Sequence, residues 1–377
     1  MSLAELVRER SLLVCVGPGG VGKTTLGASL ALAAATQGRR VAVITIDPAR
    51  RLADALGLDG LDDALRPVPG VGPGSLDAAM LDTKASYDAL IDRITDDPRA
   101  RRRILDNRVY QSFSRTLARS HAYVAMERLH DVLQEGAHDL VVLDTPPTRS
   151  ALDILDAPGR LVRFLDERVL AAFIGEPAGG AGAWIRAKGA EVALRLFGAM
   201  VGDALMRELA GFFEVFFHLR RGFAERASTV VAHLSASETG FVLVTAPQAT
   251  HLADAAYLRD GLLARGAPLE AVLFNRAFHP DAEGRPIGPG PAWSPEAEVD
   301  ALDLPDGERA SARRVLSAAR ALRGELAVAN RAFDDAMRRF AAAAGPRVHA
   351  RLRLPILDEE PATLDALTSL LERASAL

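Results

Sequence analysis

The chain has 377 residues, of which 49% are apolar and 25% charged, and its formal net charge is -4. This composition is typical of a folded protein with a sizeable core, and it argues against a broad basic surface for nucleic acid. The single cysteine, Cys15, excludes disulfides and multi-cysteine metal sites within the chain. No stretch approaches the roughly 18 apolar residues of a spanning helix, and the N-terminal segment has no apolar signal core, so we expect a cytoplasmic protein without a transmembrane segment.

The first elements expected along the chain are a strand, a loop, a helix and a second strand. Leu12–Val16 form an apolar run, a glycine-rich loop follows, the alanine-rich helical pattern closes at Gly38, and VAVITID at 41–47 predicts the next strand. Other short apolar runs, separated by helical stretches, predict strands at Leu76–Leu81, Leu140–Asp144, Phe241–Thr245, Ala271–Asn275 and Leu352–Leu354. This alternation predicts an α/β fold, with a mostly parallel sheet covered by helices on both faces.

Two long intervals carry no strand signal. Residues 84–136 and 156–236 are helical in pattern, and we expect them to form a discontinuous helical subdomain inserted into the nucleotide-binding domain. That domain would then comprise residues 1–83, 137–155 and 237–377. Near the C-terminus, residues 307–344 predict one or two helices, interrupted only by Gly324.

The segment GPGGVGKTT at 17–25 predicts a phosphate-binding loop. Gly17, Gly22, Lys23 and Thr24 have the spacing GxxxxGKT, and they lie between a predicted strand and a predicted helix. Glycines let the backbone N–H groups approach phosphate oxygens, while Lys23 would reach the β and γ phosphates and Thr24 would bind Mg²⁺. The alternative is a simple glycine turn before an alanine-rich helix, and the strand, loop and helix context argues against it.

Two carboxylates follow predicted strands near this loop. Asp144, in VVLDTPPT, stands where such proteins hold the metal directly or through water. Asp47, in TIDPARRLADAL, is a second carboxylate that would orient the attacking water or a metal-bound water. An Asp before a Pro is also a common turn residue and helix cap, so a structural role for Asp47 remains an alternative.

Three ordered segments together resemble the anion-transporting ATPases, in a bacterial branch of the family that includes the arsenite pump ATPase and the ATPase that targets tail-anchored proteins. GPGGVGKTT resembles the family's phosphate-binding loop, TIDPARRLADAL its switch I and LDTPPTRSALDIL its switch II. The resemblance extends to FVLVTAPQ at 241–248, LFNRAF at 273–278 and, more weakly, LRLPILDEEP at 352–361.

The resemblance implies Mg²⁺-dependent ATP binding and hydrolysis by a dimer. Asp47 matches the aspartate that positions the hydrolytic water, Asp144 matches the aspartate near Mg²⁺, and Asn275 matches the asparagine that contacts adenine. With Lys23, the implied catalytic residues are Asp47 and Asp144, and the implied metal site is Thr24, Asp47 and Asp144. The implied nucleotide-binding residues are Gly19, Gly20, Val21, Gly22, Lys23, Thr24, Thr25 and Asn275. The lack of an NKxD or TKxD pattern favours ATP over GTP.

The chain departs from the family at Pro18, where the family has a second lysine that acts on the partner subunit's nucleotide. By analogy with other charges that stabilise phosphoryl transfer, this loss is expected to slow hydrolysis by about 10³-fold or more. Arg50, Arg51 and Arg149 lie in the switch motifs and would supply the missing charge, unless they are solvated or paired with acids. A second hypothesis therefore makes the chain a weakly hydrolysing regulatory partner of a lysine-bearing paralogue.

The cargo is less well indicated than the ATPase. From Leu205 to Leu219 two adjacent apolar stripes predict either a core helix or a groove for a hydrophobic client, such as a membrane protein helix. One cysteine cannot form a multi-cysteine arsenite site. A homodimer and a heterodimer with a paralogue both remain open, whereas a DNA- or membrane-positioning ATPase is disfavoured because no basic face or basic C-terminal helix is evident.

Overall fold

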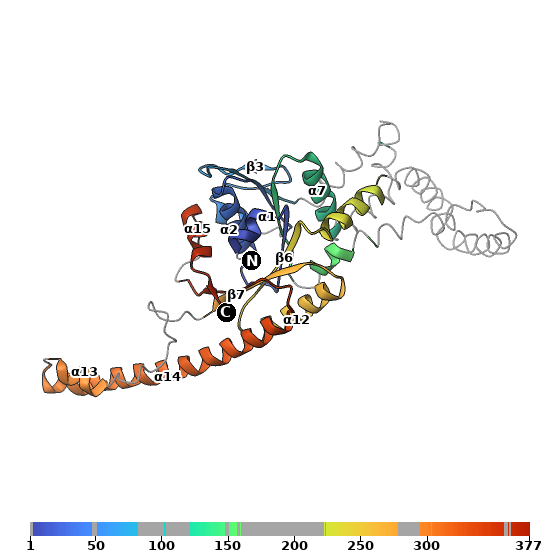
Figure 1. Cartoon of the computed structure of the whole chain (residues 1–377). Coiled ribbons are helices and arrows are strands. Elements are labelled where there is room, and N and C mark those ends of the chain that lie inside the picture. Colours follow the sequence, from blue (N-terminus) through green and yellow to red (C-terminus); the bar gives the residue numbers. More distant parts are fainter. Residues whose placement is uncertain are drawn as a thin grey trace, which may run out of the picture.

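The structure is a computed structural model, and it describes residues 3–46, 51–81, 102, 121–147, 151–156, 159, 222, 224–277, 295–302, 304–357, 361 and 363–377. In this part of the chain a central β-sheet is flanked by helices, and one long helix runs outward from it (Figure 1). The α/β fold with a mostly parallel sheet is therefore confirmed. Strands predicted from the sequence correspond to β1, β2, β4, β5, β6, β7 and β8.

The described strands form one nine-stranded sheet in the order β3-β4-β2-β5-β1-β6-β7-β8-β9. All neighbouring pairs from β4 to β8 are parallel, while β3 and β9 pair antiparallel at the two edges. The strand bounds are β1 Leu12–Val16, β2 Arg40–Thr45, β3 Arg66–Pro67, β4 Ser75–Met80, β5 Leu140–Asp144, β6 Thr239–Thr245, β7 Leu269–Ala277, β8 Ala350–Pro355 and β9 Ser375–Ala376. Because the parallel strands run the same way, the carboxyl ends of β1, β2, β5, β6 and β7 meet at one edge of the sheet.

Helices cover both faces of the sheet, as its alternating side chains require. Leu12 and Val14 of β1 point into a core shared with α7, α12 and the end of α14, whereas Leu13 and Cys15 point into a core shared with α1, α2, α3 and α15. The helix bounds are α1 Leu3–Glu9, α2 Lys23–Thr36, α3 Arg51–Leu56, α7 His121–Glu135, α12 Ala249–Ala264, α13 Pro295–Ala301, α14 Asp306–Ala343 and α15 Leu364–Glu372. Residues 151–156 and 224–234 are also helical.

Helix α14 is continuous through Gly324, so of the two alternatives predicted for residues 307–344 the structure shows one helix rather than two. Its C-terminal end packs on the sheet, where Met337 and Phe340 are buried. Its N-terminal half projects from the sheet and carries α13 beside its far end (Figure 1). There the side chains of Val315 and Leu322 are 67% and 57% exposed. Among the described residues, no helix has both the length and the apolar character needed to cross a membrane.

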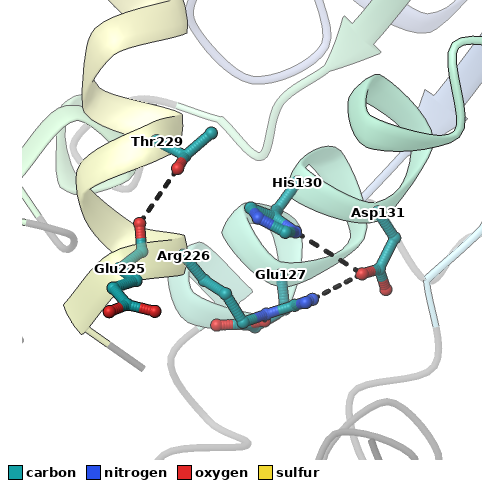
Figure 2. A network of polar contacts seen from close by, with 6 residues as sticks. All are labelled: Glu127, His130, Asp131, Glu225, Arg226 and Thr229. Carbon is teal, nitrogen blue, oxygen red and sulfur yellow. Dashed lines mark hydrogen bonds and ion pairs between the residues drawn. The ribbon is translucent and has the colours of Figure 1, made fainter. Parts of the chain in front are cut away.

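One ion-pair cluster joins α7 to the helix at residues 224–234, which lies about a hundred residues later (Figure 2). Arg226 Nε donates to Glu127 Oε2 at 2.5 Å, and its Nη2 donates to Asp131 Oδ1. The side chains of Glu127 and Asp131 are only 7% and 10% exposed. The predicted helical subdomain and its boundaries stay a prediction, because most of residues 84–136 and 156–236 lie outside the described part of the chain.

Candidate nucleotide-binding site

The predicted phosphate-binding loop lies where β1 ends and α2 begins. Two of its glycines have left-handed backbone angles, with φ of 73° at Gly20 and 89° at Gly22, which residues with a Cβ rarely adopt. Gly22 occupies the N-cap position of α2, and Leu26 N donates to its carbonyl oxygen at 3.0 Å. The backbone N–H groups at the start of α2 therefore face the loop, as an anion-binding cradle requires.

At two positions of the loop, close packing leaves no room for a residue larger than glycine. A Cβ on Gly17 would lie 2.1 Å from the carbonyl oxygen of Val244 in β6, and one on Gly22 would lie 2.5 Å from Asn275 Nδ2. The motif's glycines therefore allow two neighbouring strands to approach the loop from the same side.

The polar side chains of the loop meet the carboxylate that ends β5. Thr24 Oγ1 donates a hydrogen bond to Asp144 Oδ2 at 2.6 Å, and Thr45 Oγ1, at the end of β2, donates to the same oxygen at 2.9 Å. Asp144 is only 1% exposed. Lys23 Nζ donates to the carbonyl oxygen of Pro18 at 2.9 Å, so the lysine side chain lies back over the loop.

These oxygens fit a magnesium ion. Mg²⁺ prefers hard oxygen ligands and is usually bound by one or two carboxylates together with substrate phosphates and water. The Thr24 hydroxyl and the Asp144 carboxylate, which touch each other beside the loop, are such a donor pair. Within the described residues no group of three or more His, Cys, Asp or Glu side chains could hold a metal ion, so a dedicated all-protein cage is not found there.

The loop opens into a cavity of about 470 Å³, a volume in the usual range for small-molecule sites. Three cationic residues line it, Lys23, Arg51 and Arg276, together with the acidic residue Asp54. The other lining residues are Gly19, Gly20, Gly22, Thr24, Thr25, Ala55, Thr145, Pro147 and Pro361. The excess of cations suits a polyphosphate.

Cys15 lies beside this site but takes no part in its chemistry. Its side chain is fully buried, and burial raises the pKa of the thiol well above its usual range, with the nearby Asp144 carboxylate adding to the shift. A neutral thiol is a poor nucleophile and a poor metal ligand. The structure therefore supports a packing role for Cys15.

The structure brings together most of the residues predicted from the sequence. Gly19, Gly20, Gly22, Lys23, Thr24 and Thr25 line one cavity, and Asp144 contacts Thr24 beside it. Val21 is buried, and its carbonyl oxygen accepts a hydrogen bond from Asn275 Nδ2 at 2.8 Å. Asn275 thus holds the phosphate-binding loop, and its predicted contact with adenine stays a prediction.

Asp47, Arg50 and Arg149 lie outside the described residues. Two residues that the sequence analysis did not single out do belong to the site: Thr45, which donates to Asp144, and Arg276, which lines the cavity. The sequence could have indicated Thr45, because it lies at the end of a predicted strand, two residues before Asp47. For Arg276 the sequence offers no comparable signal.

Comparisons with known proteins match the region that carries this site. Residues 10–174 match the model of the family described as anion-transporting ATPase. The chain is 29% identical to the arsenical pump-driving ATPase of Acidiphilium multivorum over 160 residues, which cover 41% of this chain and 26% of the relative. It is 30% identical to the ATPase get3 of Aspergillus terreus over 169 residues, which cover 44% of this chain and 48% of the relative. It is 42% identical to the ATPase GET3C of Arabidopsis thaliana over 65 residues, which cover 17% of this chain and 17% of the relative.

The matched region spans less than half the length of these relatives. It includes the phosphate-binding loop, Thr24 and Asp144, whose geometry agrees with the chemistry of an ATPase. Residues 10–174, which are less than half of the chain, are therefore similar to the anion-transporting ATPase family.

Proposed function

We propose that this chain binds Mg²⁺ and ATP at residues 17–25 and hydrolyses the γ-phosphate. Lys23 would bind the β and γ phosphates, Thr24 and Asp144 would hold Mg²⁺, and Asp47 would position the attacking water. Magnesium would neutralise the charge that develops on the phosphate oxygens. The observation that carries the proposal is the 2.6 Å hydrogen bond between Thr24 and Asp144 at the mouth of a loop built for anions.

The rate of hydrolysis depends on how the charge missing at Pro18 is replaced. Arg51 is the first residue of α3 and lines the cavity, so it is a cation of this chain's own beside the loop. We propose that Arg51 supplies part of the positive charge that the second lysine supplies in the family. Without a lysine at that place, turnover by this chain alone is expected to be slow.

A second candidate function follows from the same residue. Pro18 occupies the place of the lysine that acts across the family's dimer, so the chain would bind ATP, hydrolyse it poorly and regulate a lysine-bearing paralogue. The two functions differ in their requirement for a partner. The first predicts turnover by the purified chain, and the second predicts turnover only after the paralogue is added.

Coupling of the nucleotide state to a dimer and to a hydrophobic or anionic client extends the proposal. The support for a client is the apolar pattern of residues 205–219, which lie outside the described part of the chain, together with the similarity to an arsenical pump-driving ATPase. Nucleotide-dependent crosslinking of an apolar peptide to these residues would test it, and capture that is independent of ATP would contradict it. A cytoplasmic location likewise stays a prediction.

The central test is phosphate release by the purified chain with ATP and Mg²⁺. Lys23→Ala should abolish turnover and weaken ATP binding, because the ammonium group that meets the terminal phosphates is removed. Asp144→Asn should retain nucleotide binding but raise the Mg²⁺ concentration needed for turnover. A Lys23→Ala variant that is folded by circular dichroism and releases phosphate at the wild-type rate would contradict the proposed function.

A further inference from the structure

The strongest unexplained feature of the molecule is the end of β7. The pairing of β7 with β8 shifts there: Phe274 pairs with Arg353 and Ala277 with Pro355, so three residues advance on β7 against two on β8. The extra residue is a β-bulge. Bulges beside binding sites commonly redirect a side chain that a regular strand would place elsewhere.

Arg276 lies within this bulge in a conformation that is unfavourable for its residue type. Its φ is 56°, and among the described residues it is the one non-glycine residue with positive φ. A long side chain in the left-handed region is energetically costly, and such residues concentrate at ligand sites, where surrounding contacts maintain them. A glycine at position 276 would adopt this left-handed backbone conformation without strain. The presence of an arginine there therefore needs a reason that lies in its side chain.

The contacts of Asn275 hold this strained turn against the phosphate-binding loop. Asn275 Oδ1 accepts a hydrogen bond from the backbone N–H of Arg276 at 2.9 Å, and Asn275 Nδ2 donates to Val21 O at 2.8 Å. The Asn275 side chain therefore fixes both the phosphate-binding loop and the backbone of Arg276. As a result Arg276 lines the same cavity as Lys23 and Thr24.

The strand order indicates which part of a nucleotide Arg276 would meet. β5, which carries Asp144, lies on one side of β1, while β6 and then β7 lie on the other. If Lys23, Thr24 and Asp144 hold the phosphates with Mg²⁺, the β7 side is left for the nucleoside. A guanidinium group suits the nucleoside, because it is planar and stacks on aromatic bases.

We infer that Arg276 is a nucleotide-binding residue that recognises the nucleoside half of the bound nucleotide, rather than its terminal phosphates. This inference rests on the proposed function, since it assumes that the loop binds ATP. It assigns the bulge and the positive φ of β7 to ligand binding. It also predicts that ATP and ADP benefit equally from Arg276, because they share the nucleoside.

The test is titration calorimetry of the whole chain with ATP, ADP and inorganic triphosphate, each with Mg²⁺. Arg276→Gly removes the guanidinium group and relieves the backbone strain, so the variant should fold at least as well as the wild type. We expect it to bind ATP and ADP about tenfold more weakly, as for the loss of one cation–π contact with the base, with triphosphate binding unchanged. Arg347→Ala, on the surface before β8, is the matched control and should leave all three affinities unchanged.

Two results would overturn the inference while leaving the proposed function intact. Either ADP binds to the Arg276→Gly variant as tightly as to the wild type, or triphosphate loses as much affinity as ATP. Failure of the wild type to bind ATP at all would instead overturn the proposed function. Thermal unfolding of the nucleotide-free variant ensures that a loss of affinity is not a loss of fold.

Discussion

At the scale of single residues, the glycines of the phosphate-binding loop have different structural roles. A Cβ on Gly17 would lie 2.1 Å from the carbonyl oxygen of Val244, a backbone atom of β6 that cannot move aside without disturbing the sheet. A Cβ on Gly19 would meet Pro147 Cβ at 3.6 Å, which is an ordinary contact. Gly17→Ala should therefore lower the free energy of unfolding by about 2 kcal/mol or more through overpacking.

The matched control is Gly19→Ala, which adds the same methyl group to the loop two residues further along the chain. Its free energy of unfolding should stay within about 0.5 kcal/mol of the wild type. Urea denaturation of the nucleotide-free protein measures both variants. Equal stabilities for the two would show that β6 does not restrict the loop at Gly17 as the structure describes.

The residues of the site differ in how far the sequence could predict them. Lys23, Thr24 and Asp144 were predictable because a motif and a strand end place them. The contact between Asn275 and Val21 was not, since it joins residues 254 positions apart through an amide that the family pattern assigns to adenine. Arg276 was missed because neither periodicity nor motif indicates a bulge or a positive φ at an arginine.

At the scale of elements, the strands with the clearest apolar pattern are the ones buried on both faces. Helices cover both sides of β1 and β5, so every residue of these strands is apolar or part of the site, and the pattern is strong. β3 and β9 have only two residues each and lie at the edges, where side chains such as Arg66 and Ala376 are exposed. Strands of this length have no periodicity to detect.

Helix α14 shows that one glycine need not end a helix. Gly324 lies inside its 38 residues, and a Cβ there would meet no atom within 4 Å. Gly324→Ala should therefore stabilise the projecting half of α14 by about 0.5 to 1 kcal/mol, because alanine loses less backbone entropy in a helix. Amide hydrogen exchange in α14 should slow by several-fold, whereas faster exchange there would contradict the helix as described.

The starts of β2 and β5 are joined by an ion pair that makes stability depend on pH. Arg40 Nη2 donates to Asp139 Oδ1 at 2.7 Å and Arg40 N to Asp139 Oδ2 at 2.9 Å, and these bonds lower the pKa of Asp139 to about 2 from its ordinary 3.8. A carboxyl whose pKa is lowered in the folded state stabilises the fold above its ordinary pKa. This contribution is lost as the pH falls from about 4 toward 2.

Asp139→Asn should therefore reduce stability at pH 6 and weaken its dependence on pH below 4. The urea midpoint, measured at pH 6, 4 and 3, checks both effects. The change should be small, because the pair is partly exposed and screened by solvent. An unchanged slope below pH 4 would show that Asp139 titrates normally in the folded protein.

At the scale of the whole molecule, the order of the sheet could not be read from the sequence. β1 pairs with β5 and β6, which begin more than a hundred residues later, and local patterns contain no information on such partners. The fold class follows from the alternation of elements, whereas the strand order follows from packing of the whole chain. The site depends on this order, because β1, β5 and β7 must be near neighbours before Asp144 and Asn275 can reach the loop.

The cluster of Arg226 with Glu127 and Asp131 is a further link between distant parts of the chain (Figure 2). Arg226 is 16% exposed and its two carboxylate partners are less exposed, so removing it leaves two buried acids without their shared cation. Arg226→Ala should lower the free energy of unfolding by about 3 kcal/mol, since breaking a buried ion pair on one side costs far more than the pair's net stabilisation.

An exposed ion pair provides the contrast for this prediction. Arg313 and Asp300 join α13 and α14 at 2.7 Å, with their side chains 52% and 56% exposed. Arg313→Ala should cost less than about 1 kcal/mol, because such pairs are solvated and screened. If urea denaturation gave equal losses for the two arginines, the cluster would not be the buried link between α7 and residues 224–234 that the structure describes. If only Arg226→Ala is costly, a triple variant tests the cause. Arg226→Met combined with Glu127→Gln and Asp131→Asn removes all three charges, so it should regain part of the lost free energy of unfolding if buried charge is the cause.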